Sequence, residues 1–403
     1  MRSRMLLIFI MAVCMIAGSM VFTSCGGEGD GGEGKVTVKI GLTAPLSGPG
    51  GGYGEDVKQG LDMGIAQVNE EGGLTIGDTT YIFELVPRDD EAAPERAIAN
   101  AQQFVLEEGI DIVFDPYTST IVPLLEFNTN PGEEFLIMSY TSIPIYEDIP
   151  NRLMVTEPPP FVIYIPSYIE LAMGQGWTKV AFLQTTERYG EIWGDAFKTA
   201  WTAAGGEVVA EAPASYYTET DFTPYLTTVL AANPDVLFVG GPSYPTALVM
   251  EQARGLGFTG GFICMDQAKL DDIVEVIGID KMEGTIGVQI VKSSEFPGTI
   301  SFVEQYAEVY GEEELCMWET CINYTAFMIL AKAMEAAGSV DDVFAIRDAF
   351  AEGDVSFTDP DVYPIGYNGI IDETGQLLMV GQIAFIENGQ VTSLPAIEWW
   401  LQE

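Results

Sequence analysis

The chain has 403 residues, 47% of them hydrophobic, with 17 basic and 60 acidic side chains, no histidine and a formal net charge of −43. This acidity argues against nucleic acid as a main partner and against adhesion to anionic lipid headgroups, because both need a basic surface. Without histidine, Ser–His and Cys–His catalysis are impossible and most catalytic zinc sites are disfavoured.

The first 24 residues have the features of an export signal. A short basic start precedes an apolar run over residues 5–17, which is too short to cross a bilayer comfortably. Small residues then stand directly before Cys25, and this segment resembles a bacterial lipobox, although Phe22 occupies a position where an aliphatic residue is commoner. The resemblance implies that Cys25 becomes the lipidated first residue. The alternative is an ordinary signal peptide with an incidental cysteine.

Residues 25–35 are dominated by glycine and acidic side chains, a composition that predicts a flexible, solvated tether rather than part of a core. No later stretch is apolar for the roughly 20 residues that a spanning helix requires. We therefore expect the folded part to contact the membrane through the lipid anchor only.

Strands and helices then alternate along the chain. Apolar residues at helical spacing mark the first helix, where Val57, Leu61, Ile65 and Val68 share one face. The first series is expected to contain strands at 36–42, 81–86, 110–114 and 135–138, and helices at 54–69 and from Pro94. This order predicts a parallel sheet with helices on both faces.

A second series follows the sequence Pro158-Pro159-Pro160, which interrupts regular structure and indicates a passage between two lobes. Strands are expected at 179–183, 208–210, 236–239 and 261–264, and helices at 194–204, around 226–230 and at 246–256. Helices at 318–337 and 340–351 suggest a return to the first lobe. Strands at 377–387 and 391–400, with a turn at Asn388-Gly389, are expected on the second lobe.

Short motifs stand in a characteristic order along nearly the whole chain after the tether. The opening segment 38–49 is followed by Tyr53-Gly54-Glu55-Asp56, and the further motifs are Asn69–Gly73, Arg88–Asp90 with Pro94-Glu95, Arg188-Tyr189-Gly190, Phe222, Asn233-Pro234-Asp235, Gly240-Gly241, Tyr244-Pro245 and Gln252–Gly257. Each motif alone is a weak signal. Together they resemble the branched-chain amino-acid-binding family, the type I periplasmic binding proteins that serve ABC transporters.

This resemblance implies two Rossmann-like α/β lobes with parallel central sheets, joined by a hinge of three crossings. The expected boundaries are 36–157 with 292–376 for the N-terminal lobe, and 158–291 with 377–403 for the C-terminal lobe. The implied function is capture of an amino acid by hinge closure and delivery to an ABC permease and its ATPase, outside the cytoplasm. The resemblance implies no catalysis, no cofactor and no metal.

Residues of the N-terminal lobe are carried over from the family where positions match. Ser119, after the strand that ends at Phe114, matches the serine expected to hold a ligand carboxylate. In the segment Tyr140-Thr141-Ser142, Ser142 matches a threonine of the family and Tyr140 lies near the expected carbonyl contact. Loops at the carboxyl ends of parallel strands offer hydroxyl and helix N–H groups that suit a carboxylate. The alternative for each residue is an ordinary helix cap.

The C-terminal lobe contributes aromatic and acidic positions. Tyr189 and Tyr244 match residues that close over the ligand, and Tyr53 from the first loop is expected to complete the lid. Asp266 matches the acidic residue that pairs with the ligand's ammonium group. Its alternative is a solvated loop carboxylate. None of the six tryptophans is assigned to the site.

Two departures from the family pattern leave the ligand open. Asp115 replaces a glycine beside Pro116, which adds a negative charge near the expected carboxylate site, and the run Gly50-Gly51-Gly52 is expected to lengthen or loosen the first loop. Members that resemble amide, urea or aromatic-acid binders are therefore alternatives to an amino-acid binder.

Three other classes share some of these features. A ligand-sensing module should be followed by a transmembrane helix and an output domain, which the sequence does not show. A dinucleotide enzyme needs Gly-x-Gly-x-x-Gly after the first strand, and residues 48–52 do not provide it. A purely structural surface lipoprotein remains an alternative.

Cys316 and Cys321 are the one pair of cysteines close in sequence within the folded part. An exported location permits a disulfide, but five residues apart on one straight helix is poor geometry for it. A bridge would require Cys316 to lie in the loop before the helix. Buried free thiols are the alternative.

Overall fold

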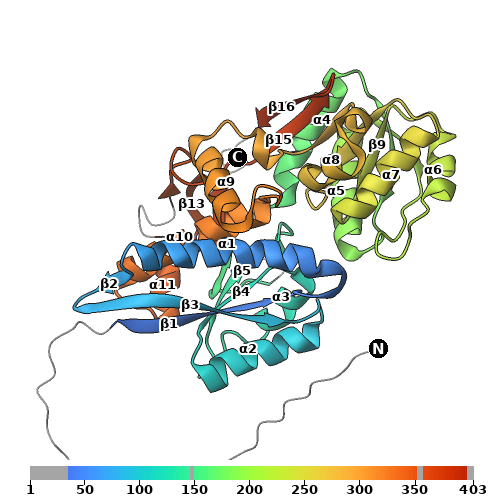
Figure 1. The fold of residues 1–403 in the computed structure, drawn as a ribbon. Coiled ribbons are helices and arrows are strands. Elements are labelled where there is room, and N and C mark those ends of the chain that lie inside the picture. The colour runs from blue at the N-terminus through green and yellow to red at the C-terminus, as the bar shows by residue number, and fades with distance from the viewer. Residues whose placement is uncertain (1–34, 146–148, 352–356, 397–403) are drawn as a thin grey trace, which may run out of the picture. The chain divides into compact units, whose positions relative to one another are not determined.

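The computed structural model describes residues 35–145, 149–351 and 357–396, which form one compact unit (Figure 1). The expected export signal, Cys25 and all but the last residue of the tether lie outside the described residues. Two α/β lobes, each built on one sheet, make up this unit.

Nine strands of the described chain form the sheet of the first lobe. In spatial order they are β12 (Phe357–Thr358), β13 (Tyr367–Ile371), β14 (Gln376–Met379), β6 (Met154–Thr156), β5 (Leu136–Ser139), β4 (Ile112–Asp115), β1 (Val36–Ala44), β3 (Thr79–Asp89) and β2 (Leu74–Ile76). The strands from β14 to β3 run parallel, and antiparallel pairs lie at both edges.

Seven strands within the described ranges form the sheet of the second lobe. Their order is β16 (Gln390–Pro395), β15 (Gln382–Glu387), β11 (Thr285–Val288), β10 (Gly261–Cys264), β9 (Val236–Gly240), β7 (Lys179–Gln184) and β8 (Glu207–Glu211). The strands from β11 to β8 are parallel, whereas β15 and β16 form an antiparallel hairpin beside β11. The parallel central sheets expected from the sequence are therefore confirmed.

Helices cover the sheets, as the alternating sequence pattern predicts. Those of the first lobe are α1 (Gly51–Glu70), α2 (Pro94–Glu108), α3 (Thr118–Leu125), α9 (Pro297–Tyr310), α10 (Trp318–Ala337) and α11 (Val343–Ala349). Those of the second lobe are α4 (Tyr164–Gly174), α5 (Arg188–Ala203), α6 (Thr223–Leu230), α7 (Ser243–Gly255) and α8 (Leu270–Ile277). The predicted limits of α10 are confirmed at both ends.

The chain passes between the two sheets three times. It leaves the first sheet after β6, returns after β11 through α9, and leaves again between β14 and β15. The single strand predicted over 377–387 is wrong, because Met379 pairs with Tyr367 in the first sheet and Gln382 pairs with Pro395 in the second. Val380 and Gly381 separate the two strands, so the last passage lies later than the predicted boundary after residue 376. The predicted turn at Asn388-Gly389 joins β15 to β16.

Two helices begin earlier than the sequence suggested. The run Gly50-Gly51-Gly52 does not loosen the first loop, because a 3₁₀ turn over Gly48–Gly50 leads directly into α1 at Gly51. The helix expected over 194–204 is α5, which begins at Arg188. Both regions are rich in glycine, and glycine weakens the helical signal in a sequence without preventing helix formation when packing favours it.

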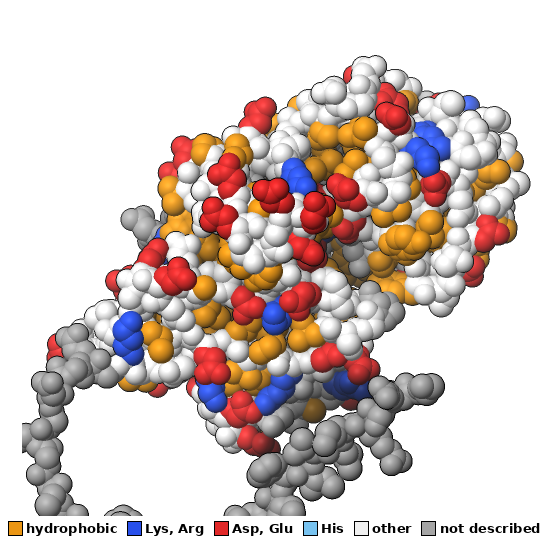
Figure 2. Space-filling model, viewed as in Figure 1, with side chains coloured by type: hydrophobic (Ala, Val, Ile, Leu, Met, Phe, Trp, Pro, Cys, Tyr) orange, Lys and Arg blue, Asp and Glu red, His pale blue; other side chains and the backbone are white. Residues whose placement is uncertain are grey.

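Acidic side chains are scattered over the visible face of the molecule, among apolar and uncharged polar groups, and are more frequent there than basic ones (Figure 2). The distribution agrees with the formal net charge of −43. No helix in the described part of the chain is long and apolar enough to span a membrane.

Gly60 allows the close approach of α1 to α10. A Cβ atom added at Gly60 would lie 2.3 Å from the carbonyl oxygen of Thr320 and 3.0 Å from the amide nitrogen of Tyr324, both of them backbone atoms that cannot rotate away. We expect Gly60→Ala to lower the free energy of unfolding by about 1–3 kcal/mol, measured by urea denaturation. Gly52→Ala is the matched control in the same helix, because an added Cβ there meets nothing within 4 Å. An equal effect of both substitutions would contradict this account.

Candidate ligand-binding site between the two lobes

The candidate site is formed by loops at the carboxyl ends of parallel strands from both sheets. In the first lobe these loops follow β4 and β5, and in the second they follow β7 and β10. Ligands of open α/β sheets bind at this edge, because the loops and the amino ends of the following helices present unpaired polar groups there.

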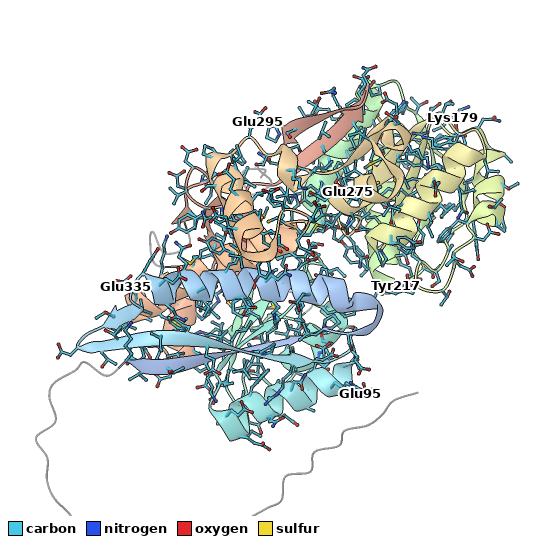
Figure 3. The ribbon with its side chains drawn as sticks, viewed as in Figure 1. Glu95, Lys179, Tyr217, Glu275, Glu295 and Glu335 are labelled. Carbon is cyan, nitrogen blue, oxygen red and sulfur yellow. The ribbon has the colours of Figure 1, made fainter. Side chains whose placement is uncertain are left out.

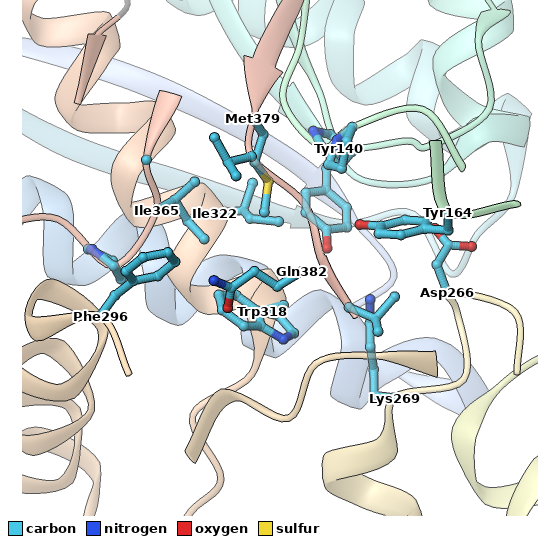
Figure 4. Close-up of a pocket in the computed structure, with 16 residues that line it drawn as sticks. Tyr140, Tyr164, Asp266, Lys269, Phe296, Trp318, Ile322, Ile365, Met379 and Gln382 are labelled. Carbon is cyan, nitrogen blue, oxygen red and sulfur yellow. The ribbon is translucent and has the colours of Figure 1, made fainter. Parts of the chain in front are cut away.

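A cavity of about 40 Å³ lies where the two lobes meet the segments that join them (Figure 4). Such a volume holds about three water molecules. Its walls are mainly apolar and aromatic, with charged groups from the second lobe. The lining residues are Tyr140, Pro158, Pro159, Tyr164, Asp266, Lys269, Val288, Phe296, Trp318, Ile322, Pro364, Ile365, Gly366, Met379, Val380 and Gln382.

Asp266 is fixed by two aromatic side chains from α5. Its Oδ1 atom accepts a hydrogen bond of 2.9 Å from Trp193 Nε1 and a second from the hydroxyl of Tyr189. Burial, followed by the charge of Asp266, raises the pKa of Tyr189 well above its ordinary value, so this hydroxyl stays protonated and donates. Asp266 is 8% exposed. Both bonds are made by Oδ1, and Asp266 is one of the residues that line the cavity.

Hydroxyl groups connect the two lobes on the same side. Ser142 Oγ lies 3.0 Å from Tyr189 Oη, and Tyr117 Oη lies 3.5 Å from the hydroxyl of Tyr217 (labelled in Figure 3). Because Tyr189 also donates to Asp266, Ser142 is linked through it to the acidic group. The predicted residues Ser142, Tyr189 and Asp266 therefore form one connected set.

The first lobe adds a cluster of aromatic and hydroxyl groups. The hydroxyl of Tyr53 donates to the carbonyl oxygen of Pro116 at 2.9 Å, and its ring packs edge-on against Tyr140 with centroids 6.0 Å apart. Thr118 Oγ1 and Thr141 Oγ1 are 2.6 Å apart. Tyr140 and Tyr164 lie beside Asp266 in the close-up of the cavity (Figure 4).

A buried ion pair crosses between the lobes. Lys269 Nζ, just before α8, lies 3.1 Å from Glu319 Oε1 in the first turn of α10, and their side chains are 13% and 2% exposed. Burial alone would lower the pKa of Lys269, but Glu319 and Asp266 outweigh it and raise that pKa. The ammonium group therefore remains charged between the two acidic side chains.

Two of the predicted site residues lie apart from this set. Ser119 is an exposed residue of the first turn of α3, and no hydrogen bond of its side chain is found in the described chain. Tyr244 is 60% exposed near the start of α7 and does not line the cavity. In the contacts seen here, Thr118 is the hydroxyl residue of this turn that reaches Thr141.

Asp115 does not extend toward a ligand. Its Oδ1 atom accepts hydrogen bonds from the backbone N–H of Tyr117 at 3.0 Å and from Thr120 Oγ1 at 2.7 Å, so it shapes the turn into α3. Burial raises the pKa of Asp115 well above its ordinary value, and the two hydrogen bonds only partly oppose this effect. Burial therefore disfavours the negative charge that the sequence predicted beside the carboxylate site.

Four residues of the site are not among those predicted from the sequence. Two of them are tryptophans: Trp193 donates to Asp266, and Trp318 lines the cavity. The other two, Lys269 and Glu319, form the ion pair between the lobes. A signal for Trp193 was present, because residues four apart on a helix share one face and Tyr189 precedes it by four. Nothing comparable in the sequence links Lys269 to Glu319, which are 50 positions apart.

Two carboxyl groups near this ion pair, those of half-buried Asp56 and buried Asp271, predict a pH-dependent stability. Burial raises the pKa of Asp56 to about 8, with Glu319 as the next cause, and burial raises that of Asp271 to about 7. Because both folded-state values exceed the ordinary value of 3.8, protonated carboxyls favour the folded state. Their contribution is complete below about pH 4 and is lost as the pH rises to about 7–8.

We therefore expect the melting temperature to fall between pH 4 and pH 8. Asp56→Asn should flatten this slope, because asparagine stays neutral at every pH. Glu275→Gln, at an exposed position on α8 (labelled in Figure 3), should leave the slope unchanged. The check is thermal unfolding followed by circular dichroism across this range, and an unchanged slope in Asp56→Asn would refute the assignment.

Two α/β lobes joined by three chain passages, with a partly polar cavity between them, define a ligand-binding protein of the type I periplasmic binding fold. The chain belongs to the periplasmic binding protein family, whose model matches residues 37–390. Within it, the chain is a relative of the Leu/Ile/Val-binding proteins, which are substrate-binding components of ABC transporters. The resemblance found in the sequence is thus confirmed.

Individual relatives agree with this assignment. The Leu/Ile/Val-binding protein BraC3 of Rhizobium johnstonii is 26% identical over 78% of this chain and 84% of its own length. Among solved structures, a solute-binding protein of R. palustris in complex with 4-hydroxybenzoate covers 91% of this chain and 99% of its own, with 20% identity and a TM-score of 0.75. LivJ of Streptococcus pneumoniae in complex with isoleucine covers 89% and 99%, with 18% identity and a TM-score of 0.72.

Proposed function

We propose that this protein captures an amino acid, branched-chain or similar, and delivers it to an ABC permease. The observation that carries the proposal is Asp266, which lines the cavity and whose Oδ1 atom is held by Tyr189 and Trp193. A carboxylate oriented in this way is suited to a ligand ammonium group, and a charge-assisted hydrogen bond of this kind contributes about 1.5–3 kcal/mol.

The carboxylate end of the ligand is assigned to the first lobe. Thr141 and Ser142 follow β5, and the amino end of α3 contributes Ser119 and its backbone N–H group. Hydroxyl and N–H donors at a helix start bind a carboxylate without a basic side chain. Burial raises the pKa of Asp115 and disfavours its charged form, which reduces the opposition of this residue to a ligand carboxylate.

Closure of the two lobes is proposed to enclose the ligand. Tyr53 and Tyr140 on the first lobe, and Tyr189 and Tyr244 on the second, would cover it. Since Tyr244 is 60% exposed, its participation requires a movement of its side chain or its lobe. A ligand that contacts both lobes favours the closed arrangement, because only there can both lobes contact it at once.

An aromatic acid is the second candidate ligand. The cavity walls include Tyr140, Tyr164, Phe296 and Trp318, which offer flat apolar surfaces suited to a ring. A structural neighbour contains 4-hydroxybenzoate, and another contains isoleucine. The two ligands make opposite demands on Asp266, which benefits an ammonium group and repels a lone carboxylate.

We further propose that the protein is exported and held by a lipid on Cys25, so that its substrate is collected outside the cytoplasm. The support is the lipobox-like segment before Cys25 and the glycine-rich residues after it. Metabolic labelling with a radioactive fatty acid should mark the wild-type chain. Cys25→Ala should abolish the label, and a label retained in that variant would overturn the anchor.

Isothermal calorimetry on the purified protein tests the ligand. Leucine, isoleucine and valine are expected to bind, whereas the matching amides without a carboxylate and the matching acids without an amino group should bind much more weakly. Binding of 4-hydroxybenzoate without binding of any amino acid would favour the second candidate. Absence of heat with every compound, from protein shown to be folded by circular dichroism, would contradict the proposed function.

A further inference from the structure

Two thiols lie side by side at the start of α10. Cys316 Sγ and Cys321 Sγ are 3.8 Å apart, and both side chains are buried. Cys316 precedes the helix, which begins at Trp318, whereas Cys321 lies within its first turns. The two cysteines therefore do not lie on one straight helix, which is the arrangement that would disfavour a disulfide between them.

Cys264 provides an internal comparison. It is buried in β10 of the other sheet, and no thiol lies within hydrogen-bonding distance of it in the described chain. The three described cysteines thus share burial but differ in whether a second sulfur is in reach. Two sulfurs at this separation need to approach by less than 2 Å to reach the disulfide length of about 2.05 Å.

We propose that Cys316 and Cys321 are joined by a disulfide in the mature protein, a modification that rests on the proposed export to an oxidising compartment. One thiolate attacks a disulfide donor, which forms a mixed disulfide and releases one donor thiol. The second thiolate then attacks the mixed disulfide and releases the other donor thiol. The protein loses two protons and two electrons, and the donor disulfide is reduced to two thiols.

The bridge closes a turn that contains contacts to the other lobe. Between the two cysteines lie Trp318, whose Nε1 donates to the carbonyl oxygen of Gln289, and Glu319, which pairs with Lys269. The N–H of Cys321 donates to the carbonyl oxygen of Met317 at 3.1 Å, which is the spacing of a helical hydrogen bond at the start of α10. A disulfide would fix the position from which both contacts are made.

Oxidation is expected during folding rather than after it. Burial, followed by the hydrogen bond with Cys316, raises the pKa of Cys321 well above its ordinary value, and the thiolate needed for exchange is therefore scarce in the folded chain. A disulfide donor should react quickly with refolding protein and slowly with folded, reduced protein.

The test is peptide mapping of the full chain after refolding in a mixture of oxidised and reduced glutathione, with free thiols alkylated. Cleavage after glutamate cuts at Glu319, between the two cysteines. The two fragments are expected to stay linked until reduction, whereas Cys264 is expected to be alkylated without reduction. The oxidised protein should melt about 3–8 °C above the reduced protein, and Cys316→Ser should remove this difference.

Two outcomes separate the pairing from the export on which it rests. Alkylation of Cys316 and Cys321 to the same extent as Cys264, in protein refolded under these conditions with a native circular dichroism spectrum, would overturn the pairing. Linked fragments after refolding but free thiols in protein taken directly from cells would support the pairing and contradict the proposed export.

Discussion

Replacing Asp266 with asparagine is expected to weaken the binding of a branched-chain amino acid about 10–150-fold, which corresponds to the loss of about 1.5–3 kcal/mol. Asparagine keeps an oxygen that accepts from Tyr189 and Trp193 but removes the negative charge of this cavity-lining side chain. Isothermal calorimetry on the folded variant measures the change in Kd.

Two controls distinguish a direct contact from a general loss of structure. Glu275→Gln removes one charge from an exposed position on the same lobe and should leave Kd unchanged. The 2-hydroxy analogue of leucine lacks the ammonium group, so its weak binding should be insensitive to Asp266→Asn. Equal losses for the amino acid and this analogue would remove the ammonium role from Asp266. Stronger binding of 4-hydroxybenzoate by the variant would favour an aromatic acid as the ligand.

Lys269→Met is expected to destabilise the contact between the lobes by about 3–5 kcal/mol, the usual cost of leaving one member of a buried ion pair without its partner. Glu319, whose side chain is 2% exposed, then lacks its basic partner. Glu319→Gln should cost less, because Asp266 and Asp271 also support the charge of Lys269. If the lobes of the variant separate and expose these groups to water, fewer molecules have the closed arrangement that binds the ligand. The destabilisation is then measured as a weaker apparent ligand affinity.

The double variant Lys269→Met, Glu319→Gln completes a double-mutant cycle. Its stability and affinity should lie closer to the wild type than those of Lys269→Met, because no unpaired charge remains. Thermal unfolding and calorimetry supply both quantities. Strictly additive effects of the two substitutions would show that this pair does not couple the lobes. Lys58, whose ion pairs with Glu55 and Asp62 are more exposed, is the matched control, and Lys58→Met should cost at most about 1 kcal/mol.

The sequence predicted the fold where its local signals agree with the final packing. Buried parallel strands such as β9 and β10 appear as short continuous apolar runs, and α10 appears as a long helix with a glycine at its end. The prediction failed at 377–387, because an apolar run does not reveal which of two sheets each half joins. Only the pairing of Met379 with Tyr367 and of Gln382 with Pro395 decides it.

The candidate site was predicted in part for a related reason. Residues that follow strands directly, such as Ser142 and Asp266, lie where the topology of parallel sheets places them. The direction of a side chain cannot be predicted in this way. Ser119 is exposed at the start of α3, whereas its neighbour Thr118 contacts Thr141. Contacts between the lobes, such as that of Lys269 with Glu319, join distant parts of the chain and have no local signature.

The position of β14 has a consequence for how the protein folds. Its pairing of Gln376 with Thr156 completes the middle of the first sheet, across an interval of 220 residues that includes most of the second lobe. Until β14 at residues 376–379 is available, β6 has an open edge, which is the kind of exposed strand that associates with other chains. Such long-range pairing slows folding. If the chain crosses a membrane before it folds, the edge of β6 stays open until residue 376 has emerged. A chaperone that shields this edge is most useful during that interval.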